Sequence, residues 1–366
     1  MELPRRITRA ERPRLIAWLD HGLRRGIRGR LEAEYPLSLR PDRLEVHRAI
    51  YCGERPVAHA AFHEVRALGP AGEIPVGMIG LVYTEPALRG RGLASACVRA
   101  CVSALRERGL PLALLWSDRK AFYHRLGFEP AGRERLLGVD SELCRRALQE
   151  LDPGRAPLGV EPVRPGDFEV LEALYAVKPL RARRAPGELA LLAAAPQTQM
   201  VVARRGGRAR AYAVLGRGDD FAGVVHEWAG SPSGVLSCLA ALARGARGLA
   251  WLTGPAADPA VEALRTAGAR EQHSPFALAR ILDAPALWQR VREKAPALDA
   301  IHLEEGPEGF RLECPQATWA LSHRQALDLL LGETLPGLLD GLVEAERRAL
   351  AACLPLPLYL WGFDSI

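Results

Sequence analysis

Apolar residues recur at characteristic spacings along the first part of the chain, and these spacings predict alternating strands and helices. Residues 47–52, 56–65 and 74–84 read as strands, and the last run is apolar almost throughout, which is typical of a strand buried on both faces. From Leu93 to Leu105 the apolar positions return every three or four residues. This periodicity predicts an amphipathic helix that ends at Gly109.

The flanking segments complete an α/β order of elements. Residues 14–24 show a helical pattern, residues 112–116 a short buried strand, and residues 119–125 a short helix that stops at Gly127. In such an order the ligand binds where the end of a strand meets the start of a helix. We therefore expect the ligand site at the junction that precedes Leu93.

A chain of 366 residues exceeds what one hydrophobic core holds, so we expect several domains. The element order of the first segment begins again near Val160, and a leucine-rich segment follows it. We divide the chain into residues 1–138, a connector at 139–157, residues 158–277 and residues 278–366. The second segment is predicted to contain a strand and helix at 163–177, strands at 200–204, 208–215, near 224 and at 248–252, and helices at 235–243 and 259–267. The third is predicted to contain helices at 284–294, 324–331 and 336–352 and strands at 300–302, 310–314 and 317–321.

The composition argues against several other classes of protein. The net charge of +6 comes from arginines spread along the chain, without a basic stripe interleaved with aromatic residues, so we expect no nucleic-acid partner. The 7 cysteines show no CxxC spacing and no accompanying histidine cluster, which predicts neither a disulfide framework nor a metal site. Cys97 and Cys101 fall on an apolar helical stripe, where core packing is favoured. Because the start of the chain lacks a signal-peptide core and no apolar run reaches about eighteen residues, we expect a cytoplasmic protein without a membrane partner.

A glycine-rich stretch, Arg89-Gly90-Arg91-Gly92-Leu93-Ala94, lies between the third strand and the amphipathic helix. The start of a helix presents unpaired backbone N–H groups and about half a positive charge, so it attracts phosphate groups. The glycines let the backbone approach a phosphate, the small Ala94 permits close packing, and the arginines add positive charge at the rim. The stretch therefore predicts a pyrophosphate site.

The pattern R-x-x-G-x-A occurs a second time, at Arg204-Arg205-Gly206-Gly207-Arg208-Ala209. A pattern this short is weak evidence by itself in a chain rich in arginine, glycine and alanine. The second copy lies between two strand-like runs, so we interpret it as a hairpin turn. Only the first copy has a strand before it and a helix after it.

Two motifs together resemble the GNAT superfamily of acetyltransferases. Residues 82–94 look like its strand and phosphate loop, and residues 121–128, Ala-Phe-Tyr-His-Arg-Leu-Gly-Phe, look like its later FY-x-x-x-GF signature. The repeated element order and the small third segment are similar to the enhanced-intracellular-survival (Eis) type of acetyltransferase. That resemblance implies two tandem mixed-sheet GNAT-like domains and a C-terminal domain like sterol carrier proteins. The second domain, which reads Glu-Trp-Ala-Gly-Ser-Pro-Ser-Gly at 227–234, is not expected to bind acetyl-CoA.

The resemblance also implies acetyl-CoA as cosubstrate, no metal, and a set of binding residues. The backbone of Val82, Tyr83 and Thr84 would hold the pantetheine arm and the acetyl group. Asp118 and Arg119 would touch the cofactor, although Asp118 has an equal alternative as the cap of the next helix. The pyrophosphate would lie against Arg89, Gly90, Arg91, Gly92, Leu93, Ala94 and Ser95.

Tyr123 is the candidate catalytic acid. By resemblance it would protonate the departing coenzyme A thiolate; the alternative is an aromatic side chain that packs beside Phe122 and Phe128. His124 follows it directly but projects elsewhere on a helix, so a solvated or supporting role is favoured.

The chain ends in an apolar, proline-containing segment at residues 354–366, which predicts a docked terminus. In Eis-type relatives the terminal carboxylate serves as general base, and here that group belongs to Ile366. A carboxylate with an ordinary pKa of about 3.5 is a poor base for an ammonium group, so it would need partial desolvation or a bridging water. The alternative is a tail packed for stability, with Asp364 or no protein group taking the proton.

The sequence leaves the acceptor open as a primary amine of a small molecule, such as an aminoglycoside or a polyamine, or of a lysine. The resemblance implies a homo-oligomer. Two other functions stay compatible with the sequence: an acyl-CoA-binding regulator without turnover, and a lipid-binding protein that uses the third domain.

Overall fold

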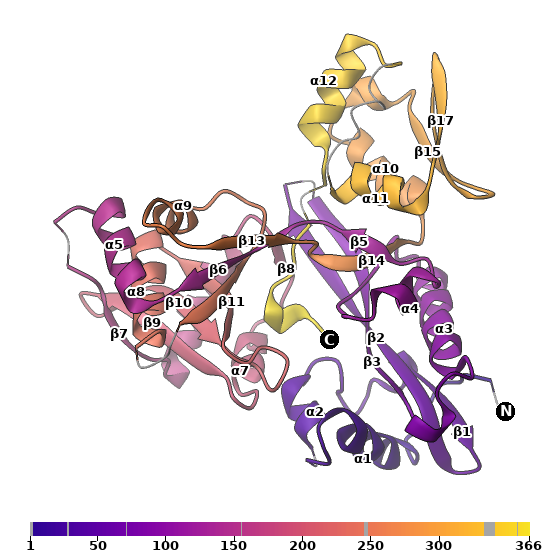
Figure 1. The fold of residues 1–366 in the computed structure, drawn as a ribbon, viewed down its shortest axis with the longest axis horizontal. Coiled ribbons are helices and arrows are strands. Elements are labelled where there is room, and N and C mark those ends of the chain that lie inside the picture. Colours follow the sequence, from indigo (N-terminus) through magenta and orange to yellow (C-terminus); the bar gives the residue numbers. More distant parts are fainter. Residues whose placement is uncertain are drawn as a thin grey trace.

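The computed structural model describes residues 3–27, 29–70, 72–154, 156–244, 248–332, 341–356 and 358–366. The chain forms two large mixed sheets, each with helices against it, and a small third sheet beside the first (Figure 1). The predicted mixture of helices and strands in an α/β arrangement is confirmed.

The first sheet has the strand order β1-β2-β3-β4-β14-β5, and β8 pairs with β2. Alternating residues of β2 divide between its two faces, because Ala60 and Phe62 pack with helix α3 whereas Ala61 packs with α1. The helices of this part are α1 (Arg12–Leu23), α2 (Arg30–Glu34), α3 (Leu93–Glu107) and α4 (Lys120–His124). The strands are β1 (His47–Cys52), β2 (Arg55–Gly69), β3 (Gly72–Thr84), β4 (Leu112–Leu115), β5 (Glu129–Ala131), β8 (Arg181–Ala182) and β14 (Ala277–Ile281).

The elements predicted for this part are confirmed, with differences only at their ends, and β1 has the predicted bounds. Helix α3 lies close to the sheet because β3 carries Gly77 where they meet: a Cβ there would lie 2.4 Å from Leu105. The apolar stripe of α3, including Cys97 and Cys101, is buried as predicted. Helix α2 and strand β5 were not predicted, since both are too short to show a period.

Strands β3 and β4 are parallel and separate along their length. Their paired residues run from Val76 and Leu112 to Met78 and Leu114. Beyond Met78 strand β3 continues to Thr84, and there it pairs only with β2 on its other edge. The separation leaves one edge of residues 79–84 open beside the start of α3.

The second sheet has the order β13-β6-β12-β11-β10-β9-β7. Its central strands and helices lie close to the predicted ranges, and the predicted connector contains helix α5. The strands are β6 (Glu134–Val139), β7 (Gly159–Pro162), β9 (Gln199–Arg205), β10 (Arg208–Leu215), β11 (Val224–Gly230), β12 (Leu249–Thr253) and β13 (Glu271–Ser274). The helices are α5 (Ser141–Leu151), α6 (Phe168–Ala176), α7 (Glu188–Ala193), α8 (Pro232–Leu242) and α9 (Pro259–Thr266).

Two strands cross the predicted domain boundaries and pair with the sheet of another segment. Strand β6, mostly within the predicted first segment, pairs with β12 and β13 of the second sheet. Strand β14, at the start of the predicted third segment, pairs with β4 and β5 of the first sheet. A short apolar run shows that a strand forms but not which distant strand it pairs with. The division into domains itself stays a prediction.

The third sheet is antiparallel, in the order β15-β16-β17, and helices pack beside it. Its strands are β15 (His302–Gly306), β16 (Gly309–Cys314) and β17 (Ala317–Leu321), and its helices α10 (Ala284–Arg292), α11 (His323–Leu331) and α12 (Glu344–Cys353). The predicted helix at 336–352 begins at residues outside the described part of the chain, and α12 covers its second half. The likeness of this part to sterol carrier proteins stays a prediction.

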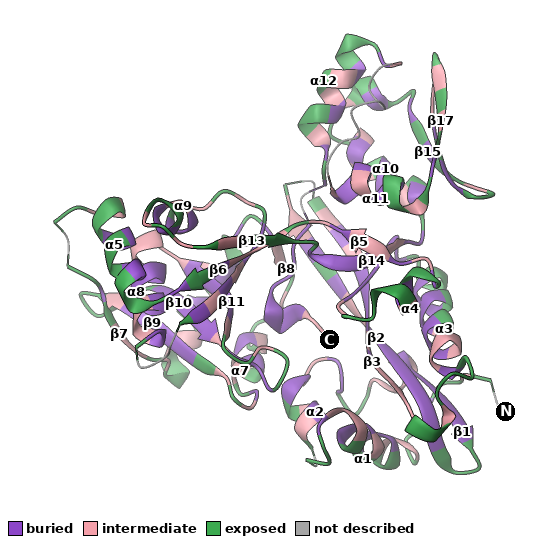
Figure 2. Cartoon of the chain, in the orientation of Figure 1, coloured by how far each residue is buried: buried purple, intermediate pink, exposed green. Residues whose placement is uncertain are grey.

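Residues 358–366, which we call the tail, follow helix α12 along the chain and lie in the space between the first two sheets (Figure 2). Tyr359, Leu360 and Trp361 are 1%, 3% and 4% exposed. The tail is therefore docked, as its apolar composition predicts.

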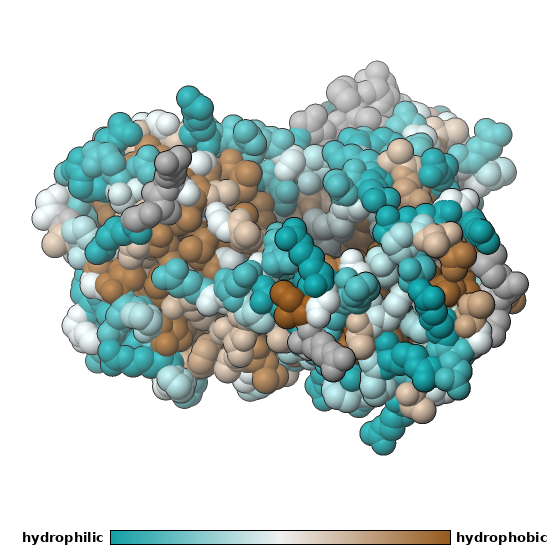
Figure 3. All heavy atoms as spheres, turned by 60° about the horizontal axis from the view of Figure 1, so that its bottom comes forward, coloured by the Kyte–Doolittle hydropathy of each residue, from teal (hydrophilic) through white to brown (hydrophobic). Residues whose placement is uncertain are grey.

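The second-sheet half of the molecule carries more hydrophobic surface than the first-sheet half on the face drawn in Figure 3. Large exposed hydrophobic residues of this half include Val170, Val177 and Leu191, on or beside α6 and α7. In the described residues no helix combines the length and hydropathy that crossing a membrane would require.

Candidate active site

A cavity of about 570 Å³ opens at the carboxyl end of β3, where β3 and β4 have separated. We call it the loop cavity, because the glycine-rich loop forms one wall. The predicted residues Val82, Tyr83, Thr84, Arg89, Gly90, Gly92, Leu93, Ala94, Ser95 and Arg119 line it, together with Gly22, Leu23, Leu88, Phe122, Tyr123 and Arg125. Arg91 is exposed and lies outside this lining.

The loop has the backbone conformation that the motif requires. Gly90 and Gly92 have φ of 79° and 78°, a region that disfavours side chains, and a Cβ at either position would meet nothing within 4 Å. Gly92 is the N-cap of α3, and no side chain caps that helix. The first N–H groups of α3 are therefore available to an anion in the loop cavity.

The open edge of β3 supplies the other polar groups of this cavity. Its backbone from Ile79 to Thr84 is not paired with β4, and the buried hydroxyl of Thr84 has no hydrogen-bond partner in the described residues. Arg89 Nε donates to Thr84 O at 3.3 Å and draws the loop toward the strand. An extended amide-bearing chain that ends in phosphates fits this combination of free strand edge and helix start.

A second cavity of about 580 Å³ lies on the other side of Val82 and Tyr123. We call it the tail cavity, because Ile366 and other tail residues line it. It shares Leu23, Val82 and Tyr123 with the loop cavity, so the two cavities meet at these residues. The remaining lining includes Gly80, Trp116, Asp118, Glu134, Arg217, Asp220, Phe276, Tyr359 and Trp361.

Tyr123 lies at this meeting point, on α4, and is 7% exposed. Burial raises the pKa of its hydroxyl to about 12, while Ser117 and Arg119 act in the opposite direction. The hydroxyl therefore keeps its proton at neutral pH and is able to donate it. Phe122 and Phe128 contact the ring at 4.8 and 6.1 Å between centroids, so the packing role and the acid role are compatible.

The neighbours of Tyr123 take different positions. His124 is 67% exposed in its side chain and pairs with Glu129 at 2.5 Å, in agreement with the solvated role. Asp118 does not cap α4, because the N-cap is Arg119 and no side chain caps that helix. Asp118 lines the tail cavity instead, whereas Arg119 lines the loop cavity.

Ile366 brings the terminal carboxylate to β3. A Cβ added to Gly80 would lie 2.7 Å from Ile366 O, so the absence of a side chain at Gly80 makes room for the end of the chain. Arg217 holds the preceding residues: its Nη1 donates to Gly362 O at 2.6 Å and its Nη2 to Ser365 Oγ at 2.9 Å. The sequence showed the docked tail but not Arg217, which lies far away along the chain.

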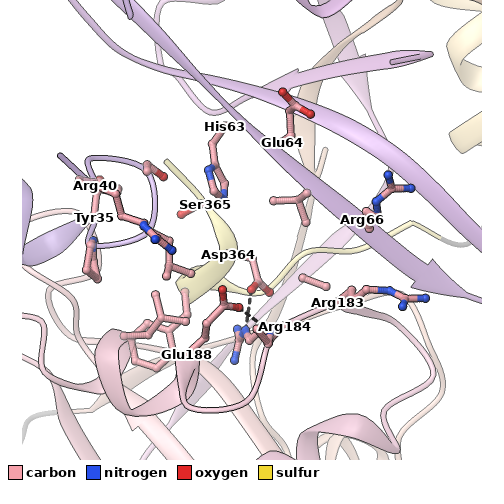
Figure 4. Close-up of a pocket in the computed structure, with 18 of the residues that line it drawn as sticks. Tyr35, Arg40, His63, Glu64, Arg66, Arg183, Arg184, Glu188, Asp364 and Ser365 are labelled. Atoms are coloured by element: carbon pink, nitrogen blue, oxygen red, sulfur yellow. Dashed lines mark hydrogen bonds and ion pairs between the residues drawn. The ribbon is translucent and has the colours of Figure 1, made fainter. Parts of the chain in front are cut away.

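Asp364 belongs to a different cavity, behind the tail, which is drawn in Figure 4. Its carboxylate pairs with Arg184 at 2.8 Å and accepts a hydrogen bond from Tyr175 at 3.0 Å. Arg184 also pairs with the fully buried Glu227, at 2.5 Å. Burial raises the pKa of Asp364 and Arg184 opposes that shift. Because Asp364 does not line the tail cavity, the geometry favours Ile366 over Asp364 as a base there.

Residues 31–131 match the family described as Acetyltransferase (GNAT) domain. The chain contains a GNAT acetyltransferase domain. An uncharacterized N-acetyltransferase of Streptomyces avermitilis is 28% identical over 211 residues, which are 53% of this chain and 51% of that protein. The chain thus spans about half the length of that relative.

Solved structures share the fold across nearly the whole chain. A probable N-acyltransferase from Enterococcus faecalis aligns with a TM-score of 0.66 at 15% identity, over 98% of this chain and 97% of that chain. Eis1 from Mycobacterium abscessus aligns with a TM-score of 0.63 at 15% identity, over 99% and 100%. Beyond the matched domain, the fold of this chain is therefore similar to that of these proteins.

Outside the GNAT domain, the second R-x-x-G-x-A copy forms the turn between β9 and β10, with Arg208 paired to Arg205. It is a hairpin, as predicted, and does not start a helix. His226 and Glu227 are fully buried and bond to Gly216 O and to Arg184 and Tyr212, which is a structural role. In the described residues no group of three or more His, Cys, Asp or Glu side chains is arranged to hold a metal ion.

Several residues of the site gave no local signal in the sequence. The wall of the tail cavity combines Trp116 just after β4, Glu134 from β6, Phe276 beside β14 and Tyr359 from the tail. These residues meet only because β6 and β14 cross between sheets and the tail returns to the first one. Tyr359 and Trp361 belong to the apolar end of the chain. Its composition predicted that this end is docked but not which part of the protein it contacts.

Proposed function

We propose that this protein is an acetyl-CoA-dependent N-acetyltransferase that transfers an acetyl group to a primary amine by direct attack. The observation that carries the proposal is that the loop cavity and the tail cavity meet at Val82 and Tyr123. A donor bound in one cavity and an amine bound in the other would react at that point, beside the phenol of Tyr123. The proposal also draws on the GNAT domain, since GNAT domains use acetyl-CoA.

Acetyl-CoA supplies a thioester, and the residues of the loop cavity would hold and polarise it. The N–H groups at the start of α3, with Gly90 and Gly92, would bind the pyrophosphate, and Arg89 would add charge. The open backbone edge at Val82 to Thr84 would pair with the amides of the pantetheine arm and orient the carbonyl. Arg119 lines the same cavity, and Arg91 stands exposed outside it.

The acceptor reacts as a free amine, so its ammonium group first gives one proton to the carboxylate of Ile366, directly or through water. The amine nitrogen then forms a bond to the carbonyl carbon as the carbon–sulfur bond breaks, and Tyr123 Oη donates its proton to the sulfur that leaves. The nitrogen loses a second proton as the amide forms, and this proton returns through solvent to Tyr123. Release of the first proton from Ile366 to solvent completes the cycle.

The charges of the tail cavity favour a cationic acceptor. Asp118, Glu134 and the terminal carboxylate line it without an ion pair in the described residues, whereas Asp220 pairs with Arg24 at 2.6 Å. Arg217 is a cation of this wall, and no carboxylate forms an ion pair with it in the described residues. The excess of carboxylates would concentrate an amine in its ammonium form. An aminoglycoside, a polyamine or an exposed lysine meets this requirement.

A screen of amine acceptors tests the proposal. Purified protein is incubated with acetyl-CoA and with aminoglycosides, polyamines or lysine peptides, and free thiol is measured against a blank without acceptor. Acceptor-dependent thiol release with an acetylated product is the expected result. Binding of acetyl-CoA with no release for any amine would instead favour the regulator, and no binding would contradict the proposal outright.

A further inference from the structure

One end of the tail cavity holds a carboxylate that lacks a countercharge. Glu134, at the start of β6, accepts a hydrogen bond from Ser274 Oγ at 2.9 Å, and no lysine, arginine or histidine forms an ion pair with it in the described residues. Its neighbour Arg135 is engaged elsewhere, with Gly254 O at 2.9 Å and Ala256 O at 2.6 Å. Burial raises the pKa of Glu134 to about 7, and the hydrogen bond from Ser274 opposes this shift only in part.

A buried hydroxyl in the wall of the same cavity also lacks a partner in the described residues. Tyr359 is 1% exposed, lines the same cavity, and its hydroxyl has no hydrogen-bond partner in the described residues. Buried polar groups normally have partners, because a missing hydrogen bond costs about 1–3 kcal/mol. The wall that contains Glu134 therefore also contains a Tyr359 hydroxyl that lacks a hydrogen-bond partner in the described residues.

A row of aromatic rings connects this end to the reacting centre. Trp116 and Phe276 lie 5.4 Å apart between centroids, and Phe276 and Tyr359 lie 4.9 Å apart. Trp116 is held by a hydrogen bond from its Nε1 to Phe276 O at 2.7 Å, and the next residue, Ser117, lines the same cavity as Tyr123. Aromatic faces pack against methylene groups and attract ammonium groups.

We propose that Glu134 and Tyr359 form a subsite that binds a second positively charged group of the acceptor, apart from the amine that is acetylated. The subsite deepens the proposed acetyltransferase function and rests on it. The acceptor it selects is a molecule with two cationic groups joined by an apolar spacer that lies along Trp116 and Phe276. The second ammonium group would donate to Glu134 and to Tyr359 Oη.

The test compares linear diamines with monoamines and amino alcohols of the same chain length as acceptors. For the natural chain, kcat/KM of the best diamine should exceed that of the matched monoamine by roughly tenfold or more, the usual size of a charged hydrogen bond. Glu134→Gln should remove most of this ratio, and Tyr359→Phe should reduce it by a smaller factor. The amino alcohols should behave like the monoamines.

Glu271→Gln is the matched control, since Glu271 lies on the adjacent strand β13 but not in the tail cavity. It should leave the diamine-to-monoamine ratio unchanged. Equal kcat/KM for diamines and monoamines, or a ratio that survives in Glu134→Gln, would overturn the subsite while the acetyltransferase function stands. Acetylation of no amine at all would point to failure of the proposed function instead. If Glu134→Gln does not fold, Tyr359→Phe and the amino alcohols decide the question.

Discussion

Each of the two large sheets contains a pair of parallel strands that separate along their length, but different groups lie beside the separated strands. In the first sheet β3 and β4 part after Met78, and the open edge faces the loop cavity. In the second sheet β11 and β12 pair only at Val224 with Ala250 and at Val225 with Trp251. Farther along β11, Trp228 packs on Trp251 and on Trp361 of the tail, at 5.2 and 5.4 Å between centroids.

In the second sheet, protein side chains fill the space beside the separating strands. Lys178 Nζ lies 3.5 Å from the ring centroid of Trp228 and 3.9 Å from that of Trp361, so a protein cation and tail residues pack beside β11. The helix that follows, α8, begins at Pro232 with Ser231 as its N-cap, whereas α3 begins at a glycine loop. We infer that the second sheet holds the tail in place. The first sheet then receives the terminal carboxylate of Ile366 for the proposed reaction.

The largest effect is expected where the tail is anchored. Arg184→Leu would leave Glu227 and Asp364 as buried carboxylates without a cation, which typically costs about 3–5 kcal/mol. Thermal unfolding should show a large loss of stability. The control Arg145→Leu removes an exposed pair with Glu142 and should cost at most about 1 kcal/mol. Similar losses in both variants would mean that the buried network does not anchor the tail.

Substitution of one tyrosine in each half distinguishes a catalytic role from a structural role. Tyr123→Phe should keep the affinity for acetyl-CoA and lower kcat by roughly a hundredfold or more, because the acid is lost. Tyr212→Phe removes a hydrogen bond to Glu227 of 2.8 Å in the second sheet and should lower the melting temperature without a comparable loss of kcat. Full turnover by Tyr123→Phe would show that the thiolate leaves without this acid.

The end of the tail is expected to have a smaller effect on turnover. Two glycines appended to Ile366 move the terminal carboxylate away from Gly80, so kcat should fall by at least about tenfold while acetyl-CoA binding and melting temperature stay nearly unchanged. Ile366→Val keeps the carboxylate in place and serves as the control. Normal turnover with the added glycines would remove the base role of Ile366.

The smallest effect concerns pH and stability. The pKa of Glu134 rises from 4.5 to about 7 on folding, so the folded chain holds this proton more tightly than the unfolded chain. The contribution of that proton to stability is complete below about 4.5 and is lost as the pH rises through about 7. Melting temperatures measured across this window should therefore shift in favour of Glu134→Gln as the pH increases. A difference that does not change with pH would contradict the raised pKa.

The sequence predicted those parts of the fold and site that depend on local pattern. The strand β1, the helix α3 and the loop at Gly90 and Gly92 follow from hydrophobic period and glycine position, which act over a few residues. The crossing of β6 and β14 depends on pairing between distant strands, which a short apolar run does not encode. Glu134 and Arg217 could not be predicted as site residues, because their positions also depend on contacts between distant segments.

The central claim, that only the first sheet binds acetyl-CoA, is tested most directly by calorimetric titration of acetyl-CoA into paired glycine variants. The natural chain should bind one molecule. Gly92→Glu should weaken binding by roughly a thousandfold, because the new carboxylate repels the pyrophosphate and prevents several of its charged hydrogen bonds to the loop. Gly207→Glu is the matched control, with the same position in the repeated pattern and φ of 76° against 78°. It should bind as the natural chain does. Unchanged affinity in Gly92→Glu, or two molecules bound per chain, would contradict the account.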